Sequence, residues 1–296
     1  MKLLTVFTPT YDRAFCLEKL YQSLVKQTNQ NFKWLIVDDG STDHTKELID
    51  QWVKDAKISI DYIFQTNQGM HGAHNTAYKA IETELNVCID SDDFMPEDAV
   101  EQIISCWKQY GNESVSGIVG LDSYTNGEII GTPLPQGLKQ STLFDLYNNH
   151  GVKGDKKLVY RTELTKEFPY PIFQNEKYVG LAYKYFRLDE SYEMLLLNKV
   201  LCRVEYLADG SSRNMLKQYR RNPKGFAFYR KELMTLSFAS VFFKYRQAIH
   251  YVSSSLMMRN KNFLRDSPQK GLTMLALPFG CLLYIYVTSR TRNVLN

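Results

Sequence analysis

The chain has 296 residues, of which 44% are hydrophobic and 23% charged, and its formal net charge at pH 7 is +4. This ordinary globular composition excludes a disordered, low-complexity or collagen-like protein. Five scattered cysteines without a CxxC pair predict free thiols in a reducing cytosol and indicate neither a disulfide framework nor a zinc site. The apolar run after Lys2 is too short for a signal peptide, so we expect none.

Strand and helix signals alternate over the first 120 residues. The expected strands are 3–8, which Pro9 ends, 34–37, 58–64, 87–89 and 116–121, and the expected helices are 13–27, 45–53, 73–81 and 96–110. This alternation predicts an α/β fold with a Rossmann-like, mostly parallel sheet and helices on both faces. Residues 125–128 predict a hairpin turn. Beyond them the pattern is α+β to about residue 212, and helical after that.

Polar residues follow the first four strands, at what would be one edge of the sheet. The four segments are 8–13, 38–43, 67–69 and 90–93. The last holds three carboxylates that repel one another, so we expect a hard divalent cation, Mn²⁺ or Mg²⁺, among them. A solvated acidic turn or a helix cap is the alternative. Neither GxGxxG nor GxxxxGK[ST] occurs, so a phosphate ligand would be bound through the metal.

Four motifs in chain order carry a family resemblance. They are Phe7-Thr8-Pro9-Thr10-Tyr11-Asp12-Arg13, Trp34-Leu35-Ile36-Val37-Asp38-Asp39-Gly40-Ser41-Thr42-Asp43, Asn67-Gln68-Gly69 with Ala73-His74-Asn75, and Ile89-Asp90-Ser91-Asp92-Asp93. On these motifs residues 3–100 resemble family 2 glycosyltransferases with the GT-A fold, of the bacterial cell-surface polysaccharide type. The resemblance implies transfer of a hexose or N-acetylhexosamine from a nucleotide diphosphate donor, a UDP-sugar, with inversion at the anomeric carbon. The implied acceptor is a hydroxyl of a glycan or of a lipid-linked saccharide.

The same resemblance implies roles for individual residues. Asp92 would ligate Mn²⁺ or Mg²⁺ that bridges the diphosphate, and Asp93 would lie at the donor sugar or behind the metal. The other residues implied in donor binding are Asp39 at the uracil, Asp90 at the ribose, and Thr8, Pro9, Tyr11, Arg13, Asn67 and Gly69 around them. His74 stands where many relatives carry Arg or Lys, so its contact with the phosphates is weaker or is supplied elsewhere. His71 and His74 lack a third zinc ligand, and we expect them to line the donor site or to be exposed.

Deprotonation of the acceptor hydroxyl needs a general base on the side opposite the leaving nucleotide. The segment 170–179 resembles the family's second acidic motif, in which an acidic residue opens a helix behind an aromatic loop. Glu176 is therefore the candidate base, and Asp189 and Glu190 are the alternatives. The non-catalytic alternative is that Glu176 only stabilises the first turn of a helix through the helix dipole.

Charge is distributed unevenly along the chain. Residues 213–296 hold 15 Lys and Arg against 2 acidic residues, a net +13, which leaves −9 for residues 1–212 (21 basic, 30 acidic). A basic segment with interleaved aromatics favours an anionic partner, and nucleic acid is disfavoured because no recognition motif accompanies it. The uncharged run 272–287 is too short to span a bilayer, so it predicts an element lying at the membrane interface. A core helix or a dimer contact in a homo-oligomer is the alternative.

These patterns predict two domains, with cytoplasmic location at the inner face of the cell membrane. Residues 1–212 would form the GT-A domain, with 1–124 binding the nucleotide sugar and 125–212 the acceptor, and 213–296 a basic, mainly helical region. Two other functions stay open. One is a catalytically idle GT-A module that serves as a binding or scaffold subunit. The other is a sugar nucleotidyltransferase, which would be expected to show a Gly-rich, basic loop after the first strand.

Overall fold

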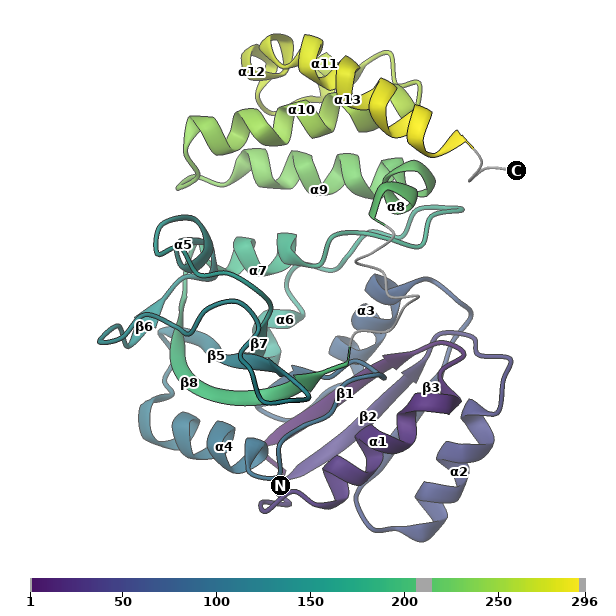
Figure 1. The fold of residues 1–296 in the computed structure, drawn as a ribbon, viewed down its shortest axis with the longest axis vertical. Coiled ribbons are helices and arrows are strands. Elements are labelled where there is room, and N and C mark those ends of the chain that lie inside the picture. Colours follow the sequence, from purple (N-terminus) through teal and green to yellow (C-terminus); the bar gives the residue numbers. More distant parts are fainter. Residues whose placement is uncertain (1, 206–214, 293–296) are drawn as a thin grey trace. The chain divides into compact units, whose positions relative to one another are not determined.

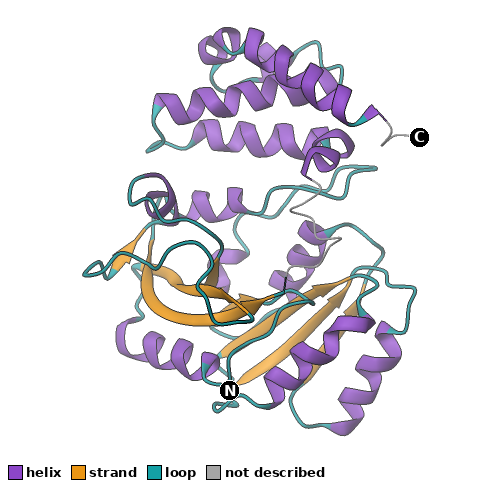
Figure 2. Ribbon diagram, viewed as in Figure 1, coloured by secondary structure: helices purple, strands orange, loops and turns teal. Residues whose placement is uncertain are grey.

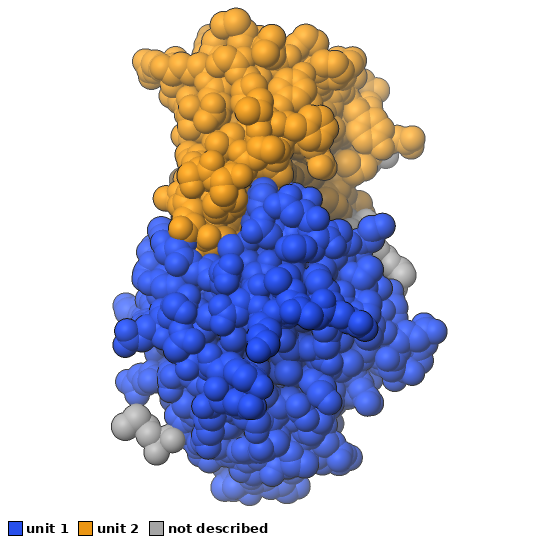
Figure 3. Space-filling model, turned by 90° about the vertical axis from the view of Figure 1, so that its left-hand side faces the viewer, with its two compact units in different colours: residues 1–169, 191–207 blue, residues 170–190, 208–296 orange. Residues whose placement is uncertain are grey.

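The computed structural model describes residues 2–205 and 215–292. The chain forms two compact units, Met1–Pro169 with Ser191–Leu207, and Tyr170–Glu190 with Ala208–Asn296, which we call unit 1 and unit 2 (Figure 3). The boundary expected after residue 212 lies outside the described residues. Unit 2 also contains residues 170–190, from the segment expected to form the acceptor half.

Unit 1 is built on one eight-stranded sheet in the order β3-β2-β1-β4-β7-β5-β8-β6 (Figures 1 and 2). Its first four strands are parallel: β1 (Leu4–Thr10), β2 (Phe32–Asp38), β3 (Ile60–Phe64) and β4 (Leu85–Cys88). The other strands are β5 (Val115–Tyr124), β6 (Gln140–Ser141), β7 (Lys156–Arg161) and β8 (Glu193–Val204). Strand β7 is antiparallel to β4 and β5, whereas β8 is parallel to β5. The predicted mostly parallel sheet is confirmed.

Helices cover both faces of this sheet. They are α1 (Ala14–Val25), α2 (Thr45–Asp55), α3 (Met70–Ala80), α4 (Ala99–Tyr110), α5 (Leu143–Asn148) and α6 (Thr162–Thr165). Successive side chains of a strand point to opposite faces. Leu4 and Val6 of β1 therefore join the core formed with α1, α2 and α4. Phe7 points the other way, onto His74 and Tyr78 of α3.

Strand β1 runs through Pro9, so the expectation that Pro9 ends it is wrong. The carbonyl of Phe7 accepts from the N–H of Ile89 (3.0 Å) on the β4 side, and that of Thr10 accepts from the N–H of Asp39 (2.8 Å) on the β2 side. Because successive residues of a strand face alternate neighbours, the nitrogen of Pro9 faces the β4 side. It lies there beyond the last residue pair between β1 and β4. Proline therefore costs no ladder hydrogen bond at this position.

Two helices of unit 1 begin at other residues than expected. Helix α3 begins before residue 73, because Gly69, with a φ of 84°, caps it and the Gly69 carbonyl accepts from the N–H of Ala73 at 3.1 Å. Helix α4 begins after Pro96. The Pro96 carbonyl accepts from the Gln27 side chain at 2.7 Å, which holds the residues before α4 as a turn. The expected hairpin at 125–128 is a tight turn flanked by a single bridge between Ser123 and Ile129.

The regular secondary structure in the described residues of unit 2 is helical, as predicted for the C-terminal region. It contains α7 (Ala182–Leu188), α8 (Met215–Arg221), α9 (Pro223–Thr235), α10 (Val241–Met257), α11 (Phe263–Asp266), α12 (Lys270–Leu275) and α13 (Leu277–Arg290). A separate core joins α9, α10 and the α12–α13 junction through Met234, Tyr251, Val252 and Ala276. Within the described ranges, no helix has the length and apolar character needed to cross a membrane.

Candidate functional site

The turn after β1 is tied to the turn after β2. The N–H of Asp12, a residue with a φ of 51°, donates to Ser41 Oγ at 2.9 Å. In return the Asp12 carboxylate accepts from the N–H of Thr42 at 2.7 Å. Asp43 accepts from the N–H of Ala14 at 3.1 Å and so holds the start of α1. The two segments predicted to meet at one edge of the sheet do so.

Asp39 holds the turn that follows β3. Its buried carboxylate accepts from Gln65 Nε2 (2.7 Å), the N–H of Gln68 (2.8 Å) and the N–H of Gly69 (2.7 Å). Asn67 lies between these donors in the chain and packs against the turn after β2, where a Cβ at Gly40 would lie 3.0 Å from the Asn67 nitrogen. In this structure Asp39 therefore positions the turn between β3 and α3. Its contact with a uracil ring stays a prediction.

The residues expected around the nucleoside differ in exposure. Thr8 is buried, and its hydroxyl accepts from Trp34 Nε1 at 2.9 Å, so its side chain belongs to the core. Tyr11, by contrast, is 49% exposed at the end of β1. The guanidinium of Arg13 lies 5.6 Å from the centre of the Phe15 ring. At this edge Tyr11 can offer a ligand its ring, whereas Thr8 is buried within the sheet, paired with Ile36 of β2.

His71 and His74 are both buried, so the expectation of exposure is wrong for them. The His74 ring packs edge-on against Phe7 at 5.2 Å, and its Nδ1 lies 2.9 Å from the carbonyl oxygen of Met70. The reason is that α3 turns this face toward β1. His74 thus contributes to packing between helix and sheet, and its contact with phosphates stays a prediction.

The acidic segment after β4 separates its carboxylates. Asp92 is half-buried and lines a cavity, whereas Asp93 is buried and points toward β8. The Asp93 carboxylate accepts from Cys202 Sγ at 3.6 Å and from the N–H of Glu205 at 3.3 Å. Burial raises the pKa of Asp93 to about 7, with Lys157 opposing the rise. The carbonyl of Asp90 closes the turn by accepting from the N–H of Asp93 at 3.0 Å.

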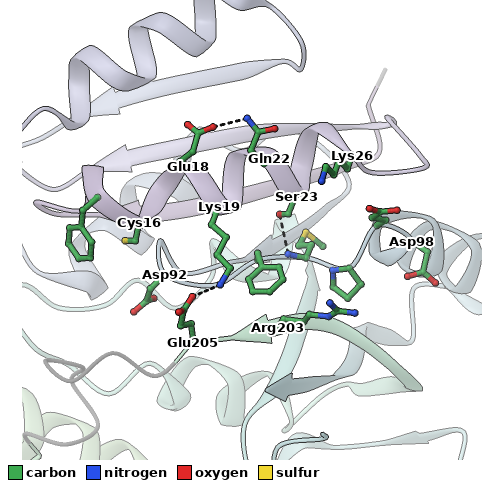
Figure 4. Close-up of a pocket in the computed structure, with 15 residues that line it drawn as sticks. Cys16, Glu18, Lys19, Gln22, Ser23, Lys26, Asp92, Asp98, Arg203 and Glu205 are labelled. Carbon is green, nitrogen blue, oxygen red and sulfur yellow. Dashed lines mark hydrogen bonds and ion pairs between the residues drawn. The ribbon is translucent and has the colours of Figure 1, made fainter. Parts of the chain in front are cut away.

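The cavity beside Asp92 has a volume of about 980 Å³ and lies between α1, the 92–98 segment and the end of β8 (Figure 4). Lys19 of α1 forms an ion pair with Glu205 and lies 4.5 Å over the Phe94 ring. Arg203 adds a second cation to the wall. A volume at the upper end of the usual range for ligand pockets accommodates a sugar with its attached groups. The sequence analysis did not identify Lys19, Arg203 and Glu205. The polar residues of α1, among them Glu18, Lys19 and Gln22, do indicate that one face of this helix is exposed.

A buried ion pair lies behind the acidic segment. Lys157 Nζ of β7 is 4.0 Å from Asp122 Oδ1 of β5, and both side chains are shielded from solvent. Burial raises the pKa of Asp122 to about 6, and Lys157 opposes that rise. Burial acts to lower the pKa of Lys157, but Asp122 and the neighbouring acidic groups hold it well above its ordinary value. The arrangement stabilises a charged lysine in the sheet behind the acidic segment.

We expect Asp122→Asn to lower the free energy of unfolding by about 3–5 kcal/mol, because it leaves Lys157 buried without its partner. The matched control is Asp61→Asn, which breaks the exposed pair of Lys33 and Asp61, 2.9 Å apart, between β2 and β3. Its cost should be about 0–1 kcal/mol. Urea denaturation of both variants measures the difference, and equal costs would contradict the role given to Asp122.

The three candidate bases lie in unit 2, whereas Asp92 lies in unit 1. Glu176 does not open a helix, contrary to expectation: it lies in the loop before α7 and caps α9. Its Oε1 accepts from the N–H of Lys224 (3.0 Å) and its Oε2 from that of Gly225 (2.8 Å). Burial raises the pKa of Glu176, and these two hydrogen bonds oppose the rise. A carboxylate at a helix N-terminus is stabilised by the helix dipole.

The alternative bases are held differently. Asp189 is buried at the end of α7, where its N–H donates to the carbonyl of Tyr185 at 3.1 Å. Glu190 pairs with Arg187 at 3.0 Å and accepts from the N–H of Ser237 at 3.2 Å. The Glu190 carboxylate is therefore held between α7 and the residues after α9, and Asp189 is buried at the end of α7. Their assignment as bases stays a prediction, as does that of Glu176.

Comparison with known proteins identifies the family. Residues 5–168, more than half of the chain, match the family described as Glycosyl transferase family 2. The chain belongs to this family, as the resemblance of its motifs predicted.

Curated relatives match about a third of the chain. An uncharacterized glycosyltransferase of Nostoc sp. is 32% identical over 105 residues, which are 36% of this chain and 33% of the relative. The teichoic acid poly(glycerol phosphate) polymerase of Staphylococcus epidermidis is 33% identical over 101 residues, 34% of this chain and 14% of the relative. The chain thus spans a third or less of the length of these two relatives.

Solved structures share the fold over nearly the whole chain. S. aureus TarS 1-349 has a TM-score of 0.64 at 17% identity and covers 98% of this chain and 91% of its own. The mannosyltransferase PcManGT from Pyrobaculum calidifontis, solved with GDP-Man and Mn²⁺, has a TM-score of 0.56 at 15% identity and covers 96% and 87%. At this level of identity the likeness shows the fold alone, and it confirms the GT-A fold.

Proposed function

We propose that this protein transfers a sugar from a UDP-sugar, with inversion, to a hydroxyl of a glycan or lipid-linked saccharide in cell-surface polysaccharide synthesis. The observation that carries the proposal is the position of Asp92, on the wall of a large cavity and in the turn that follows β4. The carboxyl ends of parallel strands are where open α/β folds bind ligands. TarS, which shares the fold, has been solved with UDP-GlcNAc, and one relative is named for teichoic acid synthesis.

We propose Asp92 as the protein ligand of Mn²⁺ or Mg²⁺. Its half-buried carboxylate faces the cavity, whereas that of Asp93 is occupied by Cys202 and Glu205. Among the residues that the structure describes, no three His, Cys, Asp or Glu side chains form a metal-binding cluster. A cation of this type often uses one or two carboxylates together with substrate phosphates. When bound, it would neutralise the charge that develops on the departing diphosphate.

Glu176 is the base that we propose, with Asp189 and Glu190 as alternatives. The support is the direction of its pKa, which burial raises above the ordinary value of a glutamate. A base is most effective when its pKa lies near the operating pH. Each carboxylate oxygen of Glu176 accepts one backbone hydrogen bond and keeps a second lone pair. The hydrogen bonds thus fix its orientation and leave capacity to take up a proton.

Turnover assays with a panel of nucleotide sugars, with and without Mn²⁺, test the proposal. We expect one or a few UDP-sugars to be consumed in the presence of the metal, and NMR of the product to show the opposite anomeric configuration from the donor. Tight donor binding without turnover on any acceptor would favour the idle binding module. Formation of a nucleotide sugar from a sugar phosphate and a nucleoside triphosphate would favour the nucleotidyltransferase. Either result would overturn the proposed transfer.

We further propose that the protein works at the cytoplasmic face of the cell membrane, where a lipid-linked acceptor would be anchored. The basic composition of residues 213–296 supports this, since anionic leaflets attract clustered Lys and Arg. Self-association stays a prediction.

A further inference from the structure

Helices α12 and α13 turn their largest apolar side chains to solvent. The exposed fractions are 57% for Met274, 67% for Leu275, 55% for Phe279, 63% for Leu282, 59% for Ile285 and 49% for Tyr286. Across α13, residues three or four apart lie on one side of a helix, so these side chains form a continuous stripe. Single exposed hydrophobic residues are ordinary on a protein surface, but a contiguous apolar patch indicates an interaction site.

The opposite side of the same helices carries small residues. Thr273, Ala276 and Gly280 are buried where α12 and α13 pack against α10, as Figure 1 shows. A Cβ at Gly280 would lie 2.4 Å from Val252 Cγ1, so the two helices approach too closely there for a larger residue. In the usual surface helix the large apolar residues face the core and polar ones face water. Here Val287 is buried, but the larger apolar side chains of the stripe face water.

The exposed stripe continues onto the start of α10. Val241 and Phe242 are 69% and 71% exposed, one turn before Tyr245. The hydroxyl of Tyr245 donates to the carbonyl of Leu275 at 3.4 Å, which brings this end of α10 beside α12. We call the whole surface the apolar face; it consists of Val241, Phe242, Met274, Leu275, Phe279, Leu282, Ile285 and Tyr286.

Charge around the apolar face is almost all positive. Residues 241–292 contain eight Lys and Arg against the single Asp266, a net +7. Arg290 lies 5.9 Å from the centre of the Tyr286 ring, and Lys270 and Arg246 are exposed nearby in the chain. A contact between two copies through this face would bring two such segments together, which like-charge repulsion disfavours. An anionic bilayer would instead attract them.

We propose that the apolar face inserts into the headgroup region of an anionic bilayer, with the flanking Lys and Arg at the lipid phosphates. Helix α13 has 14 residues, which span about 21 Å at about 1.5 Å per residue. That is less than the roughly 30 Å of a bilayer core, so the helix lies along the surface. The inference concerns lipid binding alone and does not depend on the sugar transfer proposed above.

Flotation of the full chain with lipid vesicles tests this surface. The probes are vesicles of phosphatidylcholine with phosphatidylglycerol, and of phosphatidylcholine alone. Phe279→Ser/Leu282→Ser should weaken partitioning to the anionic vesicles by about tenfold or more. The matched control is Val53→Ser/Tyr110→Ser, two residues of unit 1 that are 46% and 52% exposed, and it should float like the wild type. Circular dichroism and consumption of the donor nucleotide should be unchanged in both variants.

A fluorescent reporter gives the position of the face. The three native tryptophans, Trp34, Trp52 and Trp107, are buried in unit 1. Leu282→Trp therefore adds a separate signal, which brominated lipids in the anionic vesicles should quench, whereas Val53→Trp should not be quenched. Added salt should weaken binding, since it shortens electrostatic reach to about 8 Å at physiological ionic strength.

The proposal fails on any of three results. The first is equal flotation of Phe279→Ser/Leu282→Ser and the wild type. The second is a Leu282→Trp signal that brominated lipid leaves unchanged. The third is a wild-type dimer in light scattering that becomes a monomer in Phe279→Ser/Leu282→Ser while neither binds vesicles, which would make the face a contact between copies of this chain.

Discussion

Replacing Asp92 by Asn is expected to lower the rate of sugar transfer by about 10²–10³-fold, the usual loss when one electrostatic stabiliser of a transition state is removed. The variant keeps the size of the side chain and removes its charge. Because Asp92 is half-buried on the wall of a cavity, the fold should not change. Turnover of the UDP-sugar found in the panel, measured during titration with Mn²⁺, should show both a slower reaction and a weaker dependence on the metal.

Glu97→Gln is the matched control for this experiment. Glu97 lines the same cavity and is exposed, so removal of its charge tests whether any carboxylate there has the same effect. We expect near wild-type turnover from it. Full activity of the wild-type protein in EDTA, or equal losses of activity in the two variants, would contradict the assignment of Asp92 as a metal ligand.

Glu176→Gln is expected to reduce turnover by about 10²–10⁴-fold, the usual contribution of a positioned base, with little change in donor affinity. The structure adds a second consequence. One oxygen of the carboxylate becomes an NH₂ group facing the N–H of Lys224 or Gly225, so the cap of α9 weakens. Loss of a helix cap costs about 1 kcal/mol of stability. Calorimetry of donor binding and thermal unfolding separate the two effects.

A second variant loosens α9 without touching the carboxylate. Asn222 accepts from the N–H of Lys177 at 2.7 Å just before α9, so Asn222→Ala disturbs the same helix start. It should lose stability and keep most of its activity. If it loses as much turnover as Glu176→Gln, the carboxylate acts by holding α9. If Asp189→Asn or Glu190→Gln is inactive while Glu176→Gln is not, one of those residues is the base.

The edge of the sheet could be predicted because its geometry follows from local patterns. Parallel strands end at the same edge, so polar segments after successive strands must meet there. The hydrogen bonds from Asp12 to Ser41 and from Gly69 to Asp39 are the result. The family could be predicted for the same reason, since its motifs lie in these turns.

Other parts of the site depend on partners far away in the chain. Asp93 is buried beneath Cys202 and Glu205, which lie more than 100 positions later in the chain. The sequence around residue 93 does not predict those contacts. Glu176 was expected to open its own helix, but it caps α9, which begins at Pro223. His74 belongs to a motif of polar residues, which favoured a place in the donor site or at the surface. The direction of α3 instead buries it against Phe7. In each case tertiary packing decided the outcome.

In α13 the residues that fix the packing of the helix are different from those that form its exposed apolar stripe. Close contact between α13 and α10 depends on Gly280, where a Cβ would lie 2.4 Å from Val252, so even Gly280→Ala would push the helices apart. The stripe at Phe279, Leu282 and Ile285 carries no such constraint. Substitution of these residues by lysine and glutamate should therefore give a variant that keeps the packing of α13 on α10. Such a variant should resist aggregation during purification and be better suited to crystallisation.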